Sequence, residues 1–360
     1  MKRALKTCFA LIALALPGVA FVVAQQPYQP HVLPFRAYTD THAETRPFFQ
    51  FGNLTADIPD SSHTTFVFGG TGGGTGQPHT VGTGCYLSGI WGGYDSTLGN
   101  DSFASHIFGS NHSSITGDHC IIVGGGTHTI SGGVTGAAAV AGSTHTISMT
   151  RGCCLGGYNS QITSTGEYYL STIAGGHTHV IADSSYSLIA GGSNGEISDS
   201  NYSVINGGSS HVIETDAKYA VINGGYNHTI TDADYAVING GLTNAVTANY
   251  GVVLAGRGSS VSATYGVAGG RSCVASASGA WAIGDSVDSE LDNSTTNSFA
   301  SRFAGGYDFN GGAAVFESTV QAAGYKSSDG TAGYTGEWTV GVGDVVTIKN
   351  GLITGITPAP

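Results

Sequence analysis

The sequence predicts an all-β chain dominated by a parallel β-solenoid, a fold in which short strands of successive coils stack along one axis. Three observations predict it. Glycine supplies 58 of the 360 residues, more than twice the usual share of about 7%, without the every-third-residue spacing of collagen. Isoleucine and valine recur at fixed places in a unit of roughly 16 residues. Apolar residues with a helical period are absent from the repeated region.

The repeat is clearest after residue 186, where one unit reads YAVINGGYNHTITDAD at residues 219–234. The tyrosines that open its copies are Tyr169, Tyr186, Tyr202, Tyr219, Tyr235, Tyr250 and Tyr265. Weaker copies extend the pattern to about twelve coils between residues 85 and 285. Because a coil of this length cannot bury its own apolar face, stacked coils are expected to share one continuous core.

Two apolar columns define the expected strands, since β-branched residues favour strands and paired glycines allow the positive-φ corner between them. The first column precedes the glycine turn: Ile90, Ile107, Val140, Ile173, Ile189, Ile205, Ile222, Ile238, Leu254 and Val267. The second follows it: Leu98, Ile115, Ile130, Ile147, Ile162, Ile181, Ile197, Ile213, Ile230, Val246 and Val261. Each coil is therefore predicted to have two short strands and two turns.

The segment 1–24 has the features of a signal peptide. Lys2, Arg3 and Lys6 precede an apolar stretch, and small residues place the expected cleavage before Gln25. The alternative is an uncleaved membrane anchor, which the shortness of the apolar stretch disfavours. We therefore expect a secreted or cell-surface protein with no membrane span after removal of the signal.

Three further segments are predicted in the mature chain. Residues 25–84 form an N-terminal segment that ends in a glycine-rich linker, residues 85–290 form the repeat domain, and residues 291–360 form a small antiparallel β C-terminal domain. In the last segment, alternating apolar residues in 337–340 and 344–348, with an Asn350-Gly351 turn, predict the strands.

The charge excludes one class of function. The formal net charge is −12, and removal of the three leader cations, Lys2, Arg3 and Lys6, makes it −15. A chain this poor in lysine and arginine lacks the surface that neutralises phosphates, so we expect no nucleic-acid partner.

The unit at residues 219–234 resembles the head repeat of YadA-type trimeric autotransporter adhesins, and related repeats occur in bacteriophage tail fibres. Residues 299–309 resemble the segment that follows such repeats in fibre proteins. The resemblance covers residues 85 to about 310. It implies a left-handed parallel β-roll, three chains side by side, and attachment to a surface ligand such as a glycan. It supplies no catalytic residues.

Three columns of side chains are candidate sites. His128, His145, His179, His211 and His228 each lie two residues before the second apolar column, where they would bind a transition metal or, as we favour, serve a hydrogen-bonded turn. Asp183, Asp199, Asp216 and Asp232 would bind calcium or cap turns, and we again favour the turns. The tyrosines would present a glycan-binding surface or stack structurally, the second being favoured.

Two smaller sequence patterns are weaker candidates for functional sites. Gly191-Gly192-Ser193-Asn194-Gly195 matches the nucleophile-elbow motif of serine hydrolases, but no helix is expected after it. The odd set of mature cysteines, Cys85, Cys120, Cys153, Cys154 and Cys273, is no disulfide framework. Vicinal Cys153 and Cys154 are interpreted as small apolar residues rather than a redox pair.

The sequence therefore predicts a homotrimeric adhesive fibre, not an enzyme, with no catalytic residue, metal or cofactor. A bacteriophage tail-fibre or receptor-binding virion protein and a solenoid polysaccharide depolymerase are the alternatives. The depolymerase would need paired carboxylates in a groove. The pairs Thr127/Thr129 and Thr144/Thr146 also suggest an ice-binding solenoid.

Overall fold

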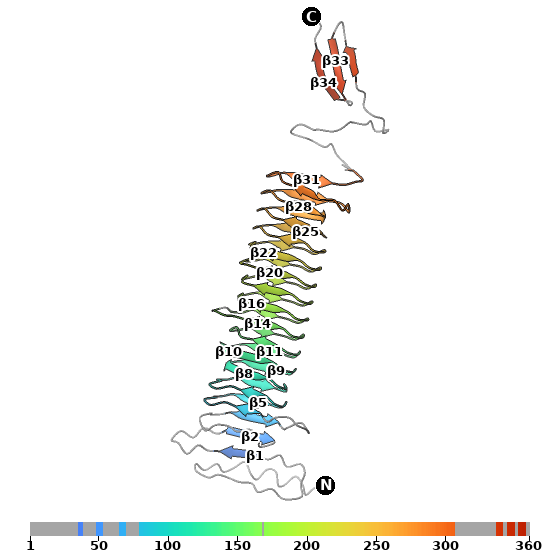
Figure 1. The fold of residues 1–360 in the computed structure, drawn as a ribbon. Helices are drawn as coiled ribbons and strands as arrows, with labels where there is room; N and C mark the ends of the chain where they lie inside the picture. The colour runs from blue at the N-terminus through green and yellow to red at the C-terminus, as the bar shows by residue number, and fades with distance from the viewer. Residues whose placement is uncertain are drawn as a thin grey trace, which may run out of the picture. The chain divides into compact units, whose positions relative to one another are not determined.

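The computed structural model describes residues 35–38, 48–52, 65–69, 79–167, 169–306, 336–340, 344–349 and 352–357. Within these residues every regular element is a strand and none is a helix. The chain divides into two compact units, Met1–Ala304 and Gly305–Pro360. The first unit holds the predicted parallel β-solenoid, whose coils stack along one axis from β3 to β31 (Figure 1).

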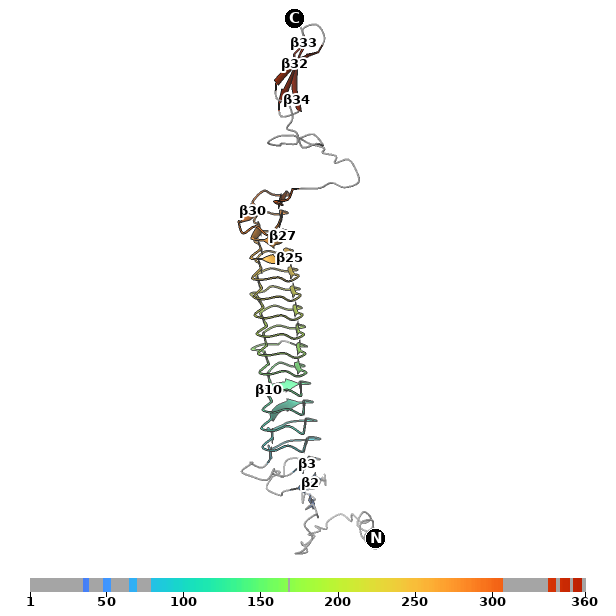
Figure 2. The ribbon, with the colours of Figure 1, turned by 90° about the vertical axis from the view of Figure 1, so that its right-hand side faces the viewer.

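Each coil contributes one strand to each of two parallel sheets, which lie on opposite sides of the stack (Figure 2). The first sheet contains β3 (Phe66–Gly69), β5 (Gly89–Trp91), β7 (His106–Phe108), β9 (Ile121–Val123), β11 (Ala138–Val140), β13 (Cys153–Cys154), β15 (Thr172–Ile173), β17 (Leu188–Ile189), β19 (Val204–Ile205), β21 (Val221–Ile222), β23 (Val237–Ile238), β25 (Val252–Arg257), β27 (Val267–Arg271), β29 (Trp281–Gly284) and β31 (Phe299–Arg302). The second contains β4 (Thr80–Val81), β6 (Thr97–Leu98), β8 (Ser114–Asp118), β10 (Thr129–Thr135), β12 (Thr146–Ile147), β14 (Gln161–Thr163), β16 (Val180–Ala182), β18 (Glu196–Ser198), β20 (Val212–Glu214), β22 (Thr229–Thr231), β24 (Ala245–Val246), β26 (Ser260–Val261), β28 (Cys273–Ala275) and β30 (Leu291–Asn293).

The solenoid is longer than the sequence repeat. The second sheet has 14 strands, one for each turn, where about twelve coils were predicted. The parallel pairing of the first sheet already includes β3, before the glycine-rich linker, and continues to β31, beyond residue 290. At both ends the coils keep the parallel register but lose the tyrosine and glycine pattern by which the repeat was recognised. Before β3, the strands β1 (Phe35–Tyr38) and β2 (Phe48–Gly52) pair antiparallel, and β2 pairs parallel with β3.

The core is the pair of apolar columns. All residues predicted for the second column are buried and stand in register, as Ile213, Ile230 and Val246 do. In the first column the prediction is confirmed for the isoleucines and wrong at three places. The inward residues there are Ala139, Val253 and Ala268 instead of Val140, Leu254 and Val267.

These errors come from counting back from the glycines. Ala141 has a φ of 56° at the place that Gly124 occupies in the preceding coil, so Gly142 is the second turn residue and not the first. Counting from Gly142 moves the assignment by one residue. Since side chains of a strand alternate between faces, one residue is enough to exchange inside for outside.

The second unit contains a three-stranded antiparallel sheet of β32 (Gly336–Val340), β33 (Asp344–Lys349) and β34 (Leu352–Thr357). The stretches predicted at 337–340 and 344–348 lie in β32 and β33. The Asn350-Gly351 turn and the signal peptide at residues 1–24 lie outside the described residues. In the described parts of the chain, no helix is long and apolar enough to cross a membrane.

Candidate functional site

The histidine column lies inside the solenoid, at the corner between the glycine turn and the second sheet. His128, His145, His179, His211 and His228 are fully buried, and His79 adds a sixth member that the sequence pattern missed. Their rings stack in the two places where neighbouring coils both carry one, with centroids 4.8 Å apart for His128 and His145 and 4.9 Å apart for His211 and His228. The predicted turn position is thus also a core position.

Five of the six histidines accept a hydrogen bond from the next coil, whereas the ring nitrogens of His145 have no well-aligned partner. The backbone N–H of His228 donates to Nδ1 of His211 at 3.2 Å, and the N–H of Asn244 donates to Nδ1 of His228 at 3.1 Å. His79, His128 and His179 accept in the same way. A nitrogen that accepts a hydrogen bond carries no proton, so the neutral ring must hold its proton on Nε2.

Two of the residues that replace histidine in this column, Asn244 and Ser259, perform the same bonding. Asn244 accepts the N–H of Ser259 through Oδ1 and donates through Nδ2 to the carbonyls of Gly240 and Gly256. Ser259 donates to the Gly270 carbonyl and accepts the N–H of Cys273. Both residues accept a hydrogen bond from the next coil, as five of the histidines do, which supports the hydrogen-bonding interpretation of the column, whereas the Ser160 hydroxyl has no partner.

Burial lowers the pKa of every histidine in the column. The pKa of His128 and of His211 falls to about 4, first through burial and second through the neighbouring histidine. The carbonyls of Gly224 and Gly241 beside His228 act in the opposite direction and partly offset the burial, although Nε2 has no well-aligned hydrogen bond there. Ring nitrogens in these positions are enclosed by turn backbone. Among the described residues, no three His, Cys, Asp or Glu side chains gather as ligands would.

The aspartates predicted to form turns all adopt left-handed backbone. Asp183, Asp199, Asp216 and Asp232 have φ between 46° and 62°, a region that aspartate tolerates better than most residues. Asp183 accepts hydrogen bonds from the backbone and hydroxyl of Thr165, and Asp216 pairs with Lys218 at 2.6 Å. The turn-forming interpretation therefore has direct support from backbone geometry.

From this geometry we expect chelators to leave the stability of the protein nearly unchanged. The thermal midpoint should differ by less than about a degree with and without EDTA, because local hydrogen bonds and Lys218 already satisfy the best-placed carboxylates. Differential scanning calorimetry measures this. A large decrease in EDTA that calcium reverses would contradict the interpretation.

The tyrosine column runs along an exposed edge of the solenoid. Rings of Tyr186, Tyr202, Tyr219, Tyr235, Tyr250 and Tyr265 stack in sequence with centroids 4.8–5.1 Å apart and nearly parallel planes. Tyr169 was predicted to belong to it, but Leu170 takes the equivalent place, with φ 62° and 45% exposure. Because the ring faces cover one another, only their edges and hydroxyl groups are open to a ligand, which supports the structural interpretation.

The outward side chains of the first sheet form what we call the apolar face. The column before the inward residue contains Ile121, Ala138, Cys153, Thr172, Leu188, Val204, Val221, Val237, Val252, Val267, Trp281 and Phe299. The column after it contains Trp91, Phe108, Val123, Val140, Leu155, Ala174, Ala190, Asn206, Asn223, Asn239 and Leu254. Leu155, in the latter column, is 49% exposed.

The outward side of the second sheet is different, since it is mostly hydroxyl-bearing. Thr97, Ser114, Thr129 and Thr146 stand in register, but Val180, Glu196 and Val212 interrupt the row. The Thr-x-Thr pairs suggested for ice binding do not share this face. Thr127 and Thr144 sit in the turn with φ of 55° and 59°, whereas Thr129 and Thr146 lie on the sheet.

Two other sequence patterns have structural places. Gly191–Gly195 forms the ordinary turn between β17 and β18, so a strand follows Ser193 where a hydrolase would need a helix. Cys154 points into the core and Cys153 outward. Both are free thiols, and burial raises the pKa of Cys154 to about 12, which disfavours the reactive thiolate.

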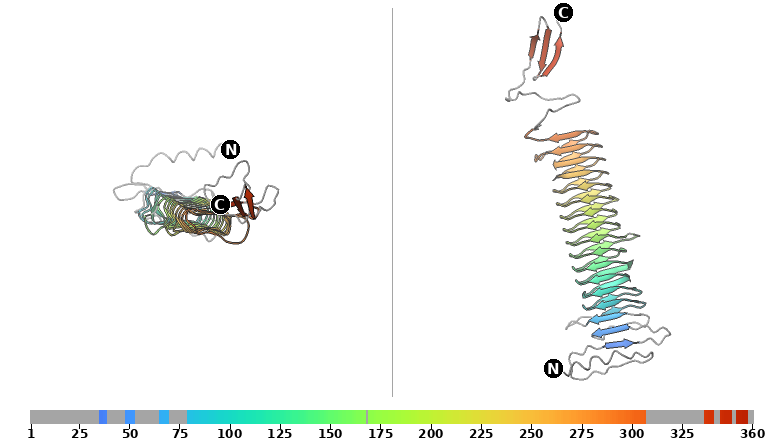
Figure 3. Two further views of the ribbon diagram at one scale, coloured as in Figure 1. Left: turned by 90° about the horizontal axis from the view of Figure 1, so that it is seen from above. Right: turned by 180° about the vertical axis from the view of Figure 1, so that it is seen from behind.

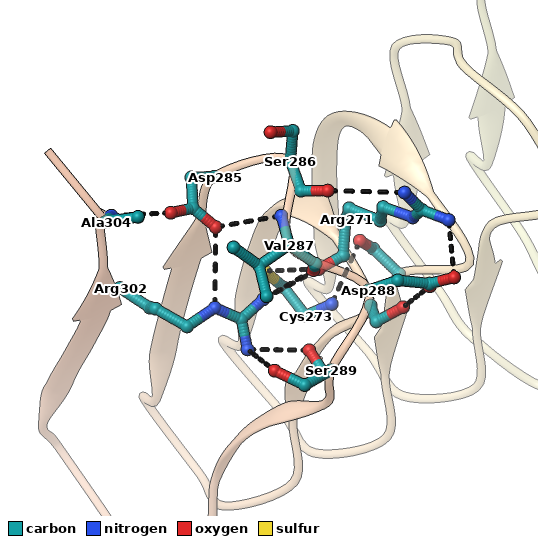
Figure 4. Close-up of polar contacts among 11 residues, drawn as sticks. Arg271, Cys273, Asp285, Ser286, Val287, Asp288, Ser289, Arg302 and Ala304 are labelled. Carbon is teal, nitrogen blue, oxygen red and sulfur yellow. Dashed lines mark hydrogen bonds and ion pairs between the residues drawn. The ribbon is translucent and has the colours of Figure 1, made fainter.

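A polar cluster that the sequence did not reveal lies in the last coils of the solenoid (Figure 4). Arg302 donates to the carbonyls of Val287 and Ser289 at 3.0 and 2.6 Å and lies 3.5 Å from Asp285, while Arg271 pairs with Asp288. Backbone N–H groups of Ala304 and Val287 donate to Asp285 and lower its pKa. These bonds hold the 285–290 loop against the stack, and each charged group in them has a structural partner.

No family model and no curated protein matches this sequence. The parallel β-solenoid and its longitudinal columns are therefore the basis for a functional proposal.

Proposed function

We propose that the chain is an extracellular adhesive fibre protein in which three copies pack side by side and bind a surface ligand without altering it. The parallel β-solenoid itself is consistent with a fibre or adhesin-like repeat protein. The observation that carries the proposal is the apolar face, which continues through coil after coil of the first sheet. Soluble proteins rarely leave so long an apolar surface open to water.

A second copy of the chain is the partner that this face fits. Leu188, Val204, Val221, Val237 and Val252 rise in register, and an identical copy placed side by side has the same repeat to match it. Beside them, the side-chain amides of Asn206, Asn223 and Asn239 bond in a ladder at 2.7 and 2.8 Å. Association around a closed symmetry axis covers such a face on every copy at once, and the resemblance to trimeric adhesin repeats favours three.

The placement of the acidic groups supports ligand binding without catalysis. A depolymerase needs two carboxyl groups facing each other across a groove, about 5–9.5 Å apart. In the described solenoid, Asp183, Asp199, Asp216 and Asp232 instead occupy successive turns at one corner. Repetition of weak contacts along the stack would supply avidity. A virion tail-fibre protein, the alternative to a cell-surface adhesive fibre, would use the same architecture and the same kind of ligand surface.

The mature chain, lacking residues 1–24, should have three times the chain mass by multi-angle light scattering at micromolar concentration. Val221→Lys should reduce this mass to that of one chain, because it places a charge in the apolar face. Thr247→Lys adds the same charge to the exposed side of the second sheet and should leave the trimer intact. Far-ultraviolet circular dichroism verifies that both variants keep the fold. A monomeric wild type would contradict the trimer.

A glycan array with the same protein tests ligand binding. We expect retained glycans of unchanged length after prolonged incubation, measured by mass spectrometry. Release of shortened oligosaccharides would identify the chain as a depolymerase instead.

A further inference from the structure

We propose that the buried histidine column makes the solenoid sensitive to acid. Its hydrogen bonds hold consecutive coils together at neutral pH and are lost in mildly acidic surroundings. The relevant positions are His79, His128, His145, His179, His211 and His228, spread from the first coils to β22. Loss of these contacts would loosen the solenoid at several levels of the stack. This behaviour does not depend on the ligand or on the number of chains in the fibre.

The geometry shows why a second proton is not tolerated. Nδ1 of His211 receives the N–H of His228, and Nδ1 of His228 receives the N–H of Asn244. A protonated Nδ1 would be a donor facing a donor, so each protonation removes a contact between two coils. Both rings are fully buried and lie 4.9 Å apart, so two charged rings would also repel each other without solvent to screen them.

The groups around the column do little to stabilise a charge. Beyond burial, His145 lowers the pKa of His128, His228 lowers the pKa of His211, and His177 lowers the pKa of His179. Among the described residues, Asp95 is the carboxylate that raises the pKa of a member, His79, and burial outweighs it. The rest of the surroundings are turn glycines and apolar core residues, with Gly195 and Ile189 packed near His179.

The pH range follows from the two states of the chain. Unfolded histidines take up protons below pH 6.5, whereas His128 and His211 stay neutral in the folded chain until about pH 4. The unfolded state therefore binds more protons between these values, and stability, complete above pH 6.5, falls as the pH falls. At pH 5 each of these two histidines should change the unfolding equilibrium constant by about 30-fold.

Asparagine provides the matched control, because Asn244 occupies the same place in the next coil with the same pattern of bonds. The test compares urea unfolding of the mature wild type and of the His211→Asn/His228→Asn variant at pH 7.5 and pH 5.0. We expect the wild type to lose much more of its urea midpoint at pH 5.0 than the variant. Equal losses would overturn the proposal, since asparagine takes up no proton in this range.

A second measurement does not require a variant. Nitrogen-15 chemical shifts of the imidazoles should show that His128 and His211 stay neutral, with the proton on Nε2, in the folded wild type at pH 5.5. Rings that are protonated while the solenoid remains folded would overturn the proposal, because acid would then not break the contacts between coils.

Discussion

Ile222→Asp is expected to unfold a large part of the solenoid. Ile222 is fully buried in β21 and stands in register between Ile205 and Ile238. The change removes about 1.5–3 kcal/mol of apolar burial and leaves an unpaired carboxylate in the core, which costs several kcal/mol more. Because each coil gains its stability from its neighbours, the damage should spread to adjacent coils. Thermal unfolding followed by circular dichroism measures the effect.

Thr247→Asp is the matched control for this change. Thr247 is exposed, immediately after Val246 of β24, so the same negative charge enters a neighbouring coil on its water-facing side. Its expected effect is within about 0.5 kcal/mol. If Ile222→Asp melts within a degree or two of the wild type, the inward register of the first sheet is wrong.

Gly225→Ala is expected to have the second-largest effect on stability. Gly225 has a φ of 100°, and an added Cβ would lie 2.5 Å from the Gly241 carbonyl oxygen and closer still to Nε2 of His228. The alanine therefore combines unfavourable backbone, about 1–3 kcal/mol, with a clash between two stacked turns that is worth about as much again. Urea unfolding at pH 7.5, where the histidines are neutral, measures the loss.

Gly224→Ala separates the two contributions. Gly224 also has a positive φ, of 136°, but nothing lies within 4 Å of the place its Cβ would occupy. It should suffer from the backbone strain alone and lose about 1–3 kcal/mol less than Gly225→Ala. Equal losses in the two variants would show that close stacking of the turns is not what requires glycine at the second position.

The outward residues explain why the surface was harder to predict than the core. Val221 and its neighbour Ile222 are equally apolar, so their residue types do not show which of the two faces the core. Val221 faces away from the core. Outward residues of other coils, such as Trp91 and Leu155, follow from strand alternation, which forbids two adjacent residues from pointing inward. In the proposed trimer these side chains would face the other copies, a contact that no single coil specifies.

The parallel β-solenoid, the second apolar column and the turn positions of the aspartates could all be predicted from the sequence, because a 16-residue period repeats the same local requirement many times. The ends of the stack and three inward residues of the first sheet could not. Ala141 and Leu170 adopt left-handed backbone that neither residue type favours, because hydrogen bonds with the adjacent coils hold the chain there.

The role of the histidines became clear only from the stacked coils. From sequence they were polar residues at a turn, with metal binding left open. Stacking of the coils buries the histidines and lowers their pKa. In five of the six, Nδ1 accepts a hydrogen bond from the backbone of the following coil. These properties depend on the neighbours above and below, about 16 residues away along the chain. The physical reason is that burial and hydrogen bonding between coils exist only once the coils have stacked.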